Sequence, residues 1–517
     1  MFLEIITMGA YLLAMLIIGI VCFRGNKSNA DYVLGGRKLG VWQAAMSAQA
    51  SDMSGWLLMG LPGLAVIYFI TKDGAATASY NGLLEAIWTA VGLAIGTYLN
   101  WLIVAKRLRK FTQVYDDSIT LPEFFEKRFD DKSGIIRFIA AVFILIFFTV
   151  YSAAQFAAGA KLFRVLFPNI DYTAALLIGA VIIVSYTFLG GFSAVCKTDL
   201  VQGILMFIVL LIVPIVAFSK LGGGAGTSST VNEIASSLGE SSIKGTATFA
   251  LITSSLAWGL GYFGQPHILA RFMGIRDSKE VRPARIIAMI WVIITLACAI
   301  LVGYLAAPYL LKFKGVTEMP IEAGNAENIF IYMTQSIFTK EALGAIAGPI
   351  IIGLFLCAVL AAIMSTADSQ LLVASSAFSQ DIFTKITKDK KDSFYMWVSR
   401  ITVVIISLIA ILIANDPGSS VFRIVQDAWA GFGAAFGPLV LFSIFWKRTT
   451  KAGALSGMVS GGLIALFWKT VFPTSNIYCL LPGFIVSAIL IVVVSLLTKK
   501  PSKDIEDKFD KALKADI

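Results

Sequence analysis

The sequence predicts an all-α polytopic membrane protein, and both its composition and its hydrophobic pattern support this fold class. Hydrophobic residues make up 57% of the 517 residues and charged residues only 14%, and the mean hydropathy is +0.81. Apolar stretches of about 20 residues, each long enough to cross roughly 30 Å of hydrocarbon, recur along the whole chain. Strands of a membrane barrel would be shorter and would alternate in polarity, so we expect helices.

Windows of that length predict about thirteen membrane spans. We place them at residues 2–23, 42–71, 80–104, 135–164, 172–190, 197–219, 247–271, 284–311, 344–379, 395–415, 423–446, 452–472 and 478–498. The first span has no small-residue cleavage site and runs directly into a basic turn, which indicates a retained helix rather than a removed signal peptide. The five cysteines show no disulfide or metal spacing and are expected to pack as small apolar residues.

Positive charge collects in alternate loops, and this pattern predicts the orientation of the chain. Lys and Arg gather at residues 24–38, 106–128, 276–285, 385–391 and 447–451. Because cytoplasmic loops carry the excess of positive charge, the N-terminus is expected outside and the C-terminal tail inside. The net charge of +10 then follows from topology, so we expect a lipid bilayer but no nucleic acid as a partner. We infer no obligatory protein partner.

Two predicted spans contain polar and helix-breaking residues at membrane depth. The first is SAQASDMSGWLLMGLPG at residues 47–63, and the second is SSLAWGLGYFGQPH at residues 254–267. Such segments survive in a membrane where they line a cavity or are buried in protein. They lie five spans apart, which predicts two five-span halves, the second inverted, with ligands bound at the breaks. Alternatively, the glycines simply allow close helix packing.

The charged and hydroxyl residues of these spans are candidates for a cation site. A carboxylate such as Asp52 costs on the order of 3 kcal/mol at the bilayer centre, so it should face a cation, a partner or water. It could also accept hydrogen bonds from amides freed at the break. In the ninth span, Ser365, Thr366 and the carbonyl of Ala362 offer the oxygen ligands that hard cations prefer. Alternatively, these hydroxyls bond their own helix carbonyls.

Five motifs carry a resemblance that covers nearly the whole chain. They are DYVLGGRKLG at 31–40, ASDMSGWLLMGLPG at 50–63, TFLGGFSAV at 187–195, AWGLGYFGQPHILARFM at 257–273 and AWAGFGAAFGP at 428–438. These segments resemble the sodium/solute symporter family, and SDMSGWLLMGLPG and YFGQPHILARFM are similar to its bacterial sodium/proline symporters. The fourth motif opens with Ala257 where the family pattern has glycine.

The resemblance implies a LeuT-like core with a five-plus-five inverted repeat, formed by the second to eleventh spans. It divides the chain into an N-terminal extra helix with the first cytoplasmic loop (1–41), a first repeat (42–219), an outer loop (220–246), a second repeat (247–450), two C-terminal extra helices (451–500) and a cytoplasmic tail (501–517). We expect the tail to be a solvated helix or a frayed end. The implied location is the bacterial cytoplasmic (inner) membrane.

The resemblance also implies a function, sodium-coupled uptake of L-proline by alternating access, and residues for it. Sodium is the coupling ion, and no cofactor is expected. The sodium ligands would be the carbonyls of Ala50, Met53 and Ala362 and the hydroxyls of Ser365 and Thr366. Sodium coupling would need Ser51, Asp52 and Asp199. The substrate would contact Ser54, Gly55, Trp56, Tyr151, Trp258, Tyr262 and Pro266.

The chemistry of these residues suits a proline zwitterion. Free backbone N–H groups at a helix break can hold its carboxylate, and its secondary ammonium needs oxygen acceptors or an aromatic face. Its small ring suits a pocket of Trp and Tyr, although each aromatic residue could equally serve interhelical packing. Asp368 stands where some proline carriers have an apolar residue. His267, beside Arg271, is expected at a cytoplasmic helix end as a local hydrogen-bond partner.

Other function classes fit the sequence less well. An ion channel would need an open polar file or a carbonyl filter, and an enzyme would need a nucleophile with its base or a metal motif; neither pattern is found. A symporter for another small solute and a transport-inactive nutrient sensor of the same fold stay open as alternatives.

Overall fold

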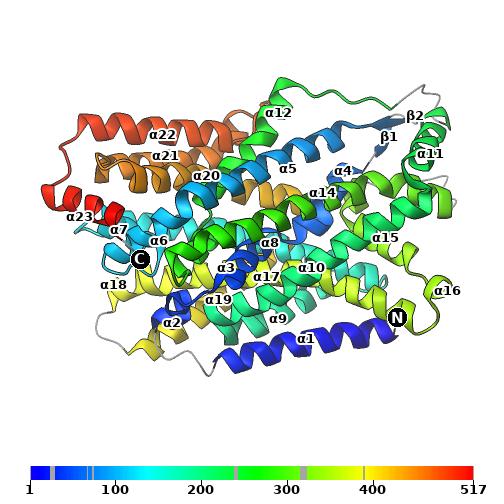
Figure 1. The fold of residues 1–517 in the computed structure, drawn as a ribbon, viewed down its shortest axis with the longest axis horizontal. Helices are drawn as coiled ribbons and strands as arrows, with labels where there is room; N and C mark the ends of the chain where they lie inside the picture. Colours follow the sequence, from blue (N-terminus) through cyan, green and yellow to red (C-terminus); the bar gives the residue numbers. More distant parts are fainter. Residues whose placement is uncertain are drawn as a thin grey trace.

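Long apolar helices run side by side through the computed structural model, and the two termini lie at opposite ends of the bundle (Figure 1). The structure describes residues 2–23, 29–66, 68–72, 75–237, 243–314, 323–387 and 391–515. In this part of the chain, ten helices are long and apolar enough to cross a membrane, and three shorter apolar helices accompany them. Together they fit the predicted number of spans. The predicted loops 24–38 and 385–391 fall partly outside the described residues.

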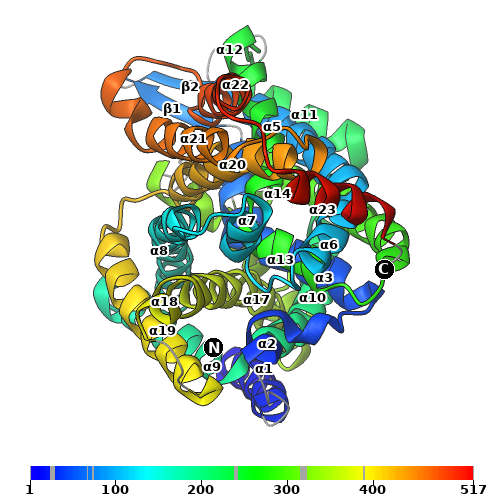
Figure 2. The same cartoon turned by 90° about the vertical axis from the view of Figure 1, so that its left-hand side faces the viewer.

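Apart from the span predicted at 42–71, the following spans have the expected bounds to within a few residues. They are α1 (Phe2–Phe23), α3 (Val41–Asp52), α5 (Asn81–Leu99), α8 (Ile135–Leu166), α9 (Tyr172–Gly190), α10 (Phe192–Leu221), α14 (Val281–Lys314), α17 (Ala347–Ser376), α19 (Asp392–Ala414), α20 (Val421–Phe445), α21 (Lys451–Val471) and α22 (Leu480–Leu497). Figure 2 looks along them from the end where the chain terminates, which we call the C side; the opposite end is the N side.

Both predicted helix breaks are present. The first span consists of α3, which ends at Asp52, then a π-helical turn (η2, Trp56–Gly60) and α4 (Leu61–Ala65). The other consists of α12 (Phe249–Leu256), a 3-10 segment (η4, Ala257–Gly264) and α13 (Pro266–Gly274), with Gln265 extended between the last two. Pro266 is the first residue of α13, a position where its missing N–H leaves no helical bond unmade. Local sequence therefore breaks both helices.

Glycines near these breaks also bring helices into close contact. The alternative that the glycines allow close helix packing therefore applies together with their role at the breaks. A Cβ on Gly261 would lie 1.9 Å from Nε1 of Trp429. A Cβ on Gly96 would lie 2.2 Å from the carbonyl oxygen of Gly259. No side chain fits in either place, and α5 and α20 can therefore pack directly on η4.

Some connections differ from the expected loops. The span predicted at 42–71 is too long, because the helix ends at Ala65 and an antiparallel pair of strands follows, β1 (Tyr68–Lys72) and β2 (Ala75–Ser79). The outer loop 220–246 contains helix α11 (Gly223–Ser237). Residues 312–343 contain a 3-10 turn (η6, Ala323–Asn328), α15 (Ile329–Ile337) and α16 (Lys340–Leu343). Polar, glycine-rich composition indicated a surface connection but not its helices.

Short helices cover the C side of the bundle (Figure 2). They are α2 (Asn29–Leu34), η1 (Gly35–Arg37), α6 (Ala105–Val114, continuing α5 through the π-helical η3, Asn100–Val104), α7 (Leu121–Arg128), η5 (Ser278–Glu280), η7 (Ala377–Phe383), α18 (Thr384–Ile386) and α23 (Lys503–Lys514). The tail helix α23 is docked rather than solvated or frayed. Phe509 is only 3% exposed, and its ring lies 5.0 Å from Phe111 and 4.9 Å from the Arg128 guanidinium.

Candidate functional site

The broken end of α3 meets α17 at a cluster of oxygen atoms. In an unbroken helix the carbonyl of Ala50 would accept from the amide of Ser54, but that amide bonds the carbonyl of Asp52 at 2.9 Å. The Ala50 oxygen instead accepts hydrogen bonds from the hydroxyls of Ser365 (2.7 Å) and Thr366 (3.3 Å). The break thus frees a carbonyl, and α17 supplies two hydroxyls to it.

This cluster has the donor set of a site for a hard cation. Ser365 Oγ also lies 3.3 Å from the carbonyl oxygen of Ala362, and Met53 is the C-cap of α3, three residues after Ala50. All five predicted ligands are fully buried. Carbonyl and hydroxyl oxygens are ligands of hard cations. Among the described residues no His, Cys, Asp or Glu cluster could hold a metal ion, so the candidate cation site is made of neutral oxygens.

Asp52 lies at the first helix break, at the end of α3, and connects it to the second break. Its Oδ2 accepts a 2.6 Å hydrogen bond from the hydroxyl of Tyr262, which is on η4, and its carbonyl accepts from the Trp56 indole at 3.1 Å. Its Oδ1 is buried and has no hydrogen-bond partner within the described part of the chain. Buried polar atoms are usually paired, and this oxygen is free to accept from water or to bind a cation. A carboxylate in this position can attract a cation.

Gln155 on α8 was missed by the sequence analysis and lies directly on the first break. Its Oε1 accepts from the amide of Gly55 at 3.3 Å, and its Nε2 donates to Ser54 Oγ at 3.2 Å. The side chain is completely buried. A Cβ on Gly55 would approach Ala158 to 3.0 Å, so only glycine lets α8 come this close. A lone amide within a run of alanines in the middle of a span was the available signal.

The predicted substrate aromatics on the two breaks lie close together. The ring centres of Trp56 and Trp258 are 6.3 Å apart. Trp429 on α20 braces the second break, because its indole donates to the carbonyl of Trp258 at 2.9 Å and its ring lies 5.0 Å from Tyr262. All four side chains are buried.

Tyr151 and Pro266 lie further toward the C side. Tyr151 is one helical turn before Gln155, and its ring faces His267 edge-on at 6.3 Å. Pro266 lines a small cavity together with Thr120 and Asp381. Pro266 therefore lies on the wall of a separate cavity and not beside the aromatic side chains of the two breaks.

Asp199 forms a buried polar network around Arg271. Its Oδ2 accepts from the hydroxyl of Ser47 at 2.6 Å and from the Arg271 guanidinium at 3.3 Å. Arg271 also donates to Ser47 Oγ at 3.0 Å and to Ser369 Oγ at 2.5 Å. Ser51, the other predicted coupling residue, donates to the Ala48 carbonyl of its own helix at 3.3 Å. The network joins α3, α10, α13 and α17 on the C side of the candidate cation site.

Two further residues singled out in the sequence are also buried in the bundle. Asp368 lies on α17 two residues beyond Thr366. His267 is the second residue of α13, at the break and not at a cytoplasmic helix end. It is a local hydrogen-bond partner through its carbonyl, which accepts from Arg271 at 2.9 Å, whereas its ring nitrogens have no partner among the described residues.

Comparison with known proteins places this arrangement in a family. A model of the sodium:solute symporter family matches residues 32–461. The chain belongs to this family. The Escherichia coli (strain K12) sodium/proline symporter is 43% identical over 98% of the chain and 96% of that protein. The osmoregulated proline transporter OpuE of Bacillus subtilis (strain 168) is 41% identical over 96% of both chains.

A solved structure with low sequence identity to this chain also supports the fold. A sodium-coupled sialic acid symporter in a substrate-bound, outward-open state superposes with a TM-score of 0.75, at 19% identity, over 97% of this chain and 99% of that one. The predicted LeuT-like fold is confirmed. The protein is thus a multi-pass membrane transporter of the sodium:solute symporter family and not an enzyme.

Proposed function

We propose that this family member carries L-proline into the cell together with sodium, by alternating access between the two sides of the membrane. The proposal rests on the contact of the Ala50 carbonyl with the hydroxyls of Ser365 and Thr366. Asp52 lies two residues after Ala50, and its buried Oδ1 has no partner in the described chain. The full-length relatives named for proline support the choice of substrate.

Sodium would take the place of the hydroxyl hydrogen bonds at this cluster. The proposed ligands are the carbonyls of Ala50, Met53 and Ala362 and the hydroxyls of Ser365 and Thr366. Because both hydroxyls can turn their hydrogens away, each offers a lone pair to the ion without movement of a helix. Sodium then holds the end of α3 against α17, and Asp52 balances its charge.

The substrate would bind at the two breaks, in contact with Ser54, Gly55, Trp56, Tyr151, Trp258, Tyr262 and Pro266. Its carboxylate can replace Gln155 Oε1 as the acceptor for the Gly55 amide, because both are oxygen acceptors that suit the start of a helix. Its ring would pack between Trp56 and Trp258. Sodium and substrate therefore share α3, and binding of one orders the segment that the other needs.

Coupling would depend on Ser51, Asp52 and Asp199. Ser51 and Asp52 lie at the end of α3, between the proposed cation ligands Ala50 and Met53 and directly before Ser54 of the substrate residues. Asp199 lies toward the C side, where Arg271 and Ser47 hold it. We propose that Asp199 receives the ion on its way out, once the network around Arg271 opens.

The proposed orientation places the N side outside the cell and the C side in the cytoplasm of a bacterium. Among the described residues of the C side are Lys106, Arg107, Arg109, Lys110, Lys127 and Arg128. Positive charge of this kind is retained on the cytoplasmic face. The proposed location is the cytoplasmic membrane, where inward-directed sodium drives uptake.

Uptake of labelled proline into proteoliposomes tests this function. An imposed inward sodium gradient is expected to drive accumulation of labelled proline. Unlabelled proline and close ring analogues should compete for this uptake. Primary amino acids of similar size should compete at least about tenfold more weakly, since a single lost specificity contact is worth about 1–3 kcal/mol. Better competition by alanine, a sugar or a carboxylate would reject proline but keep the symporter. Specific binding without any transport would favour the sensor alternative.

Gln155→Leu tests the substrate end of the site. Leucine keeps the bulk of the side chain but removes both bonds to the break, leaving the Gly55 amide and Ser54 hydroxyl without their partner. We expect the KM for proline to fall by up to about tenfold, because the substrate carboxylate no longer displaces Gln155 Oε1 and instead satisfies an otherwise unpaired buried amide; sodium half-saturation should change little. Ser152→Ala, one turn away on α8, is the matched control. An unchanged KM would mean that Gln155 is a packing residue.

A further inference from the structure

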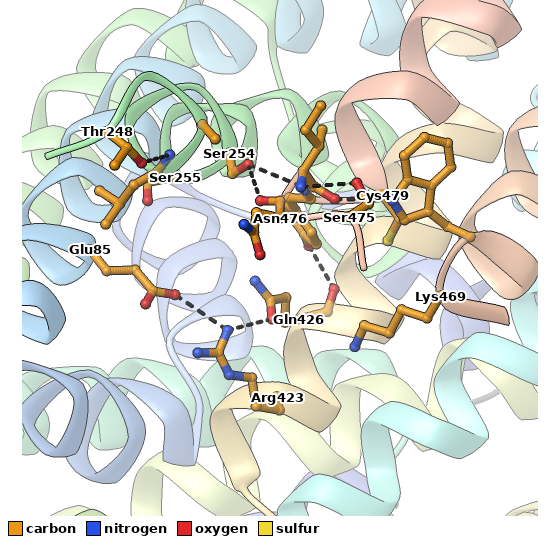
Figure 3. A pocket seen from close by; sticks show the side chains of 15 residues that line it. Glu85, Thr248, Ser254, Ser255, Arg423, Gln426, Lys469, Ser475, Asn476 and Cys479 are labelled. Carbon is orange, nitrogen blue, oxygen red and sulfur yellow. Dashed lines mark hydrogen bonds and ion pairs between the residues drawn. The ribbon is translucent and has the colours of Figure 1, made fainter. Parts of the chain in front are cut away.

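A cavity of about 540 Å³ opens on the N side behind the second broken span (Figure 3). Its walls come from α5, α12, α20 and the hairpin between α21 and α22. This hairpin follows the eleventh span in the chain and so lies outside the expected LeuT-like core. Figure 3 shows Glu85, Arg423 and Gln426 on one side, and Ser254 facing Ser475 and Asn476 of the hairpin on the other. The extra helices therefore reach the segment that bears Trp258.

The hairpin backbone is fixed to α12 through one serine. The amide of Tyr478 donates to Ser254 Oγ at 3.0 Å, and Ser254 Oγ donates to the carbonyl of Asn476 at 3.3 Å. The indole of Trp468 closes the hairpin by donating to the carbonyl of Ile477 at 3.0 Å. These bonds set where residue 478 lies relative to the broken span.

The side chain of Tyr478 points inward from this hairpin. It is 8% exposed, its hydroxyl donates to the carbonyl of Gln426 on α20 at 2.6 Å, and its ring centre lies 5.5 Å from that of Trp258. Trp258 has Phe422 on α20 at 5.1 Å and Trp56 at 6.3 Å as further neighbours. Tyr478 thus supports Trp258 from the N side, and its hydroxyl anchors it to α20.

We propose that Tyr478 is a positioning residue for the solute site, holding the Trp258 indole against Trp56 so that the two rings can enclose an apolar ring of the substrate. This inference rests on the proposed function, since it assigns Trp258 to the substrate. The two helices that follow the core thereby contribute to solute affinity. The hydrogen bonds and ring contact of Tyr478 described above are with Ser254, Gln426 and Trp258, so we expect it to affect the solute rather than sodium.

The test compares Tyr478→Ala, Tyr478→Leu and Tyr478→Phe in purified, reconstituted full-length protein. Tyr478→Ala removes the ring, and we expect the KM for proline to rise about 3- to 10-fold, the range given by loss of one aromatic pair. The maximal rate and the sodium half-saturation at saturating proline should change less than about twofold. Tyr478→Phe keeps the ring and should restore most of the affinity, with Tyr478→Leu in between.

Phe472→Ala is the matched control, because Phe472 is an aromatic residue of the same hairpin that is 51% exposed and contacts Trp468. The same rise in KM for this variant would overturn the proposal, as would an unchanged KM in Tyr478→Ala. Failure of both Tyr478→Ala and Tyr478→Leu to reach the membrane would show a folding role and overturn it too. If the wild type transports another solute, only the proline assignment fails. The KM values of the three variants are then measured for that solute.

Discussion

Asp52→Asn is expected to lower sodium-coupled proline uptake at least about 30-fold, because loss of one partner of a buried charge pair is worth 2–5 kcal/mol or more. Asparagine keeps the shape of the side chain, and its oxygen can still accept from Tyr262, as Oδ2 of Asp52 does. What it lacks is the negative charge at Oδ1, the oxygen that has no partner in the described chain. A cation at the proposed site would then lack the charge of the carboxylate at the end of α3.

Initial uptake rates in proteoliposomes at saturating sodium measure this effect, normalised to the amount of inserted protein. Asp507→Asn, in an exposed position on α23, controls for the loss of one charge. Uptake by Asp52→Asn equal to that of the wild type would mean that the carboxylate only accepts hydrogen bonds at the break. Tyr262→Phe separates the two contributions, since it removes the hydroxyl donor and keeps the charge.

Ser365→Ala and Thr366→Val are each expected to raise the sodium concentration for half-maximal uptake about 10- to 100-fold. Each variant removes one oxygen from the cluster at Ala50, and a hydrogen bond or ligand contact to a charged group is worth about 1.5–3 kcal/mol. Valine has nearly the shape of threonine, so packing between α3 and α17 changes little. At high sodium the maximal rate should recover, because the ion and not the helix contact is weakened.

Sodium titration of proline uptake measures this shift, and Thr366→Ser, which retains the hydroxyl, should restore the wild-type value. Ser375→Ala provides a control on the same helix, where the hydroxyl bonds only the Leu372 carbonyl at 3.0 Å. Lithium is the expected substitute for sodium. Uptake that ignores sodium and follows a proton gradient would reject the cation site and the role of Asp52 with it.

The helix breaks that the sequence predicted depend on local chemistry. The first break lies next to Gly55, Pro266 begins the helix after the second break, and a carboxylate such as Asp52 is costly in hydrocarbon unless it has a partner. The meeting of Ala50 with Ser365 and Thr366 was expected from family resemblance, and the structure brings these residues together. Their roles as sodium ligands are for the titrations above to test.

Other residues of the site are set by contacts between distant segments. Gln155 could be recognised as a polar residue in a span, but not as the partner of the Gly55 amide. Arg271 meets Asp199 and Ser369 from three different helices, a relation that no spacing along the chain encodes. The tail was expected to be a solvated helix or a frayed end because it mixes Lys with Asp and Glu, whereas the burial of Phe509 needs the surface of α6.

The sequence by itself determined which segments cross the membrane, where two of them break, and which oxygen-bearing residues lie at the breaks. These features follow from transfer of polar groups into hydrocarbon and from backbone geometry, both of which act within a few residues of the chain. The tertiary structure alone decided that Gln155 fills the first break, that Arg271 holds Asp199, and that Tyr478 from outside the core supports Trp258. The reason is that helix rotation and close packing at glycines fix which side chains meet, and these depend on the whole bundle at once.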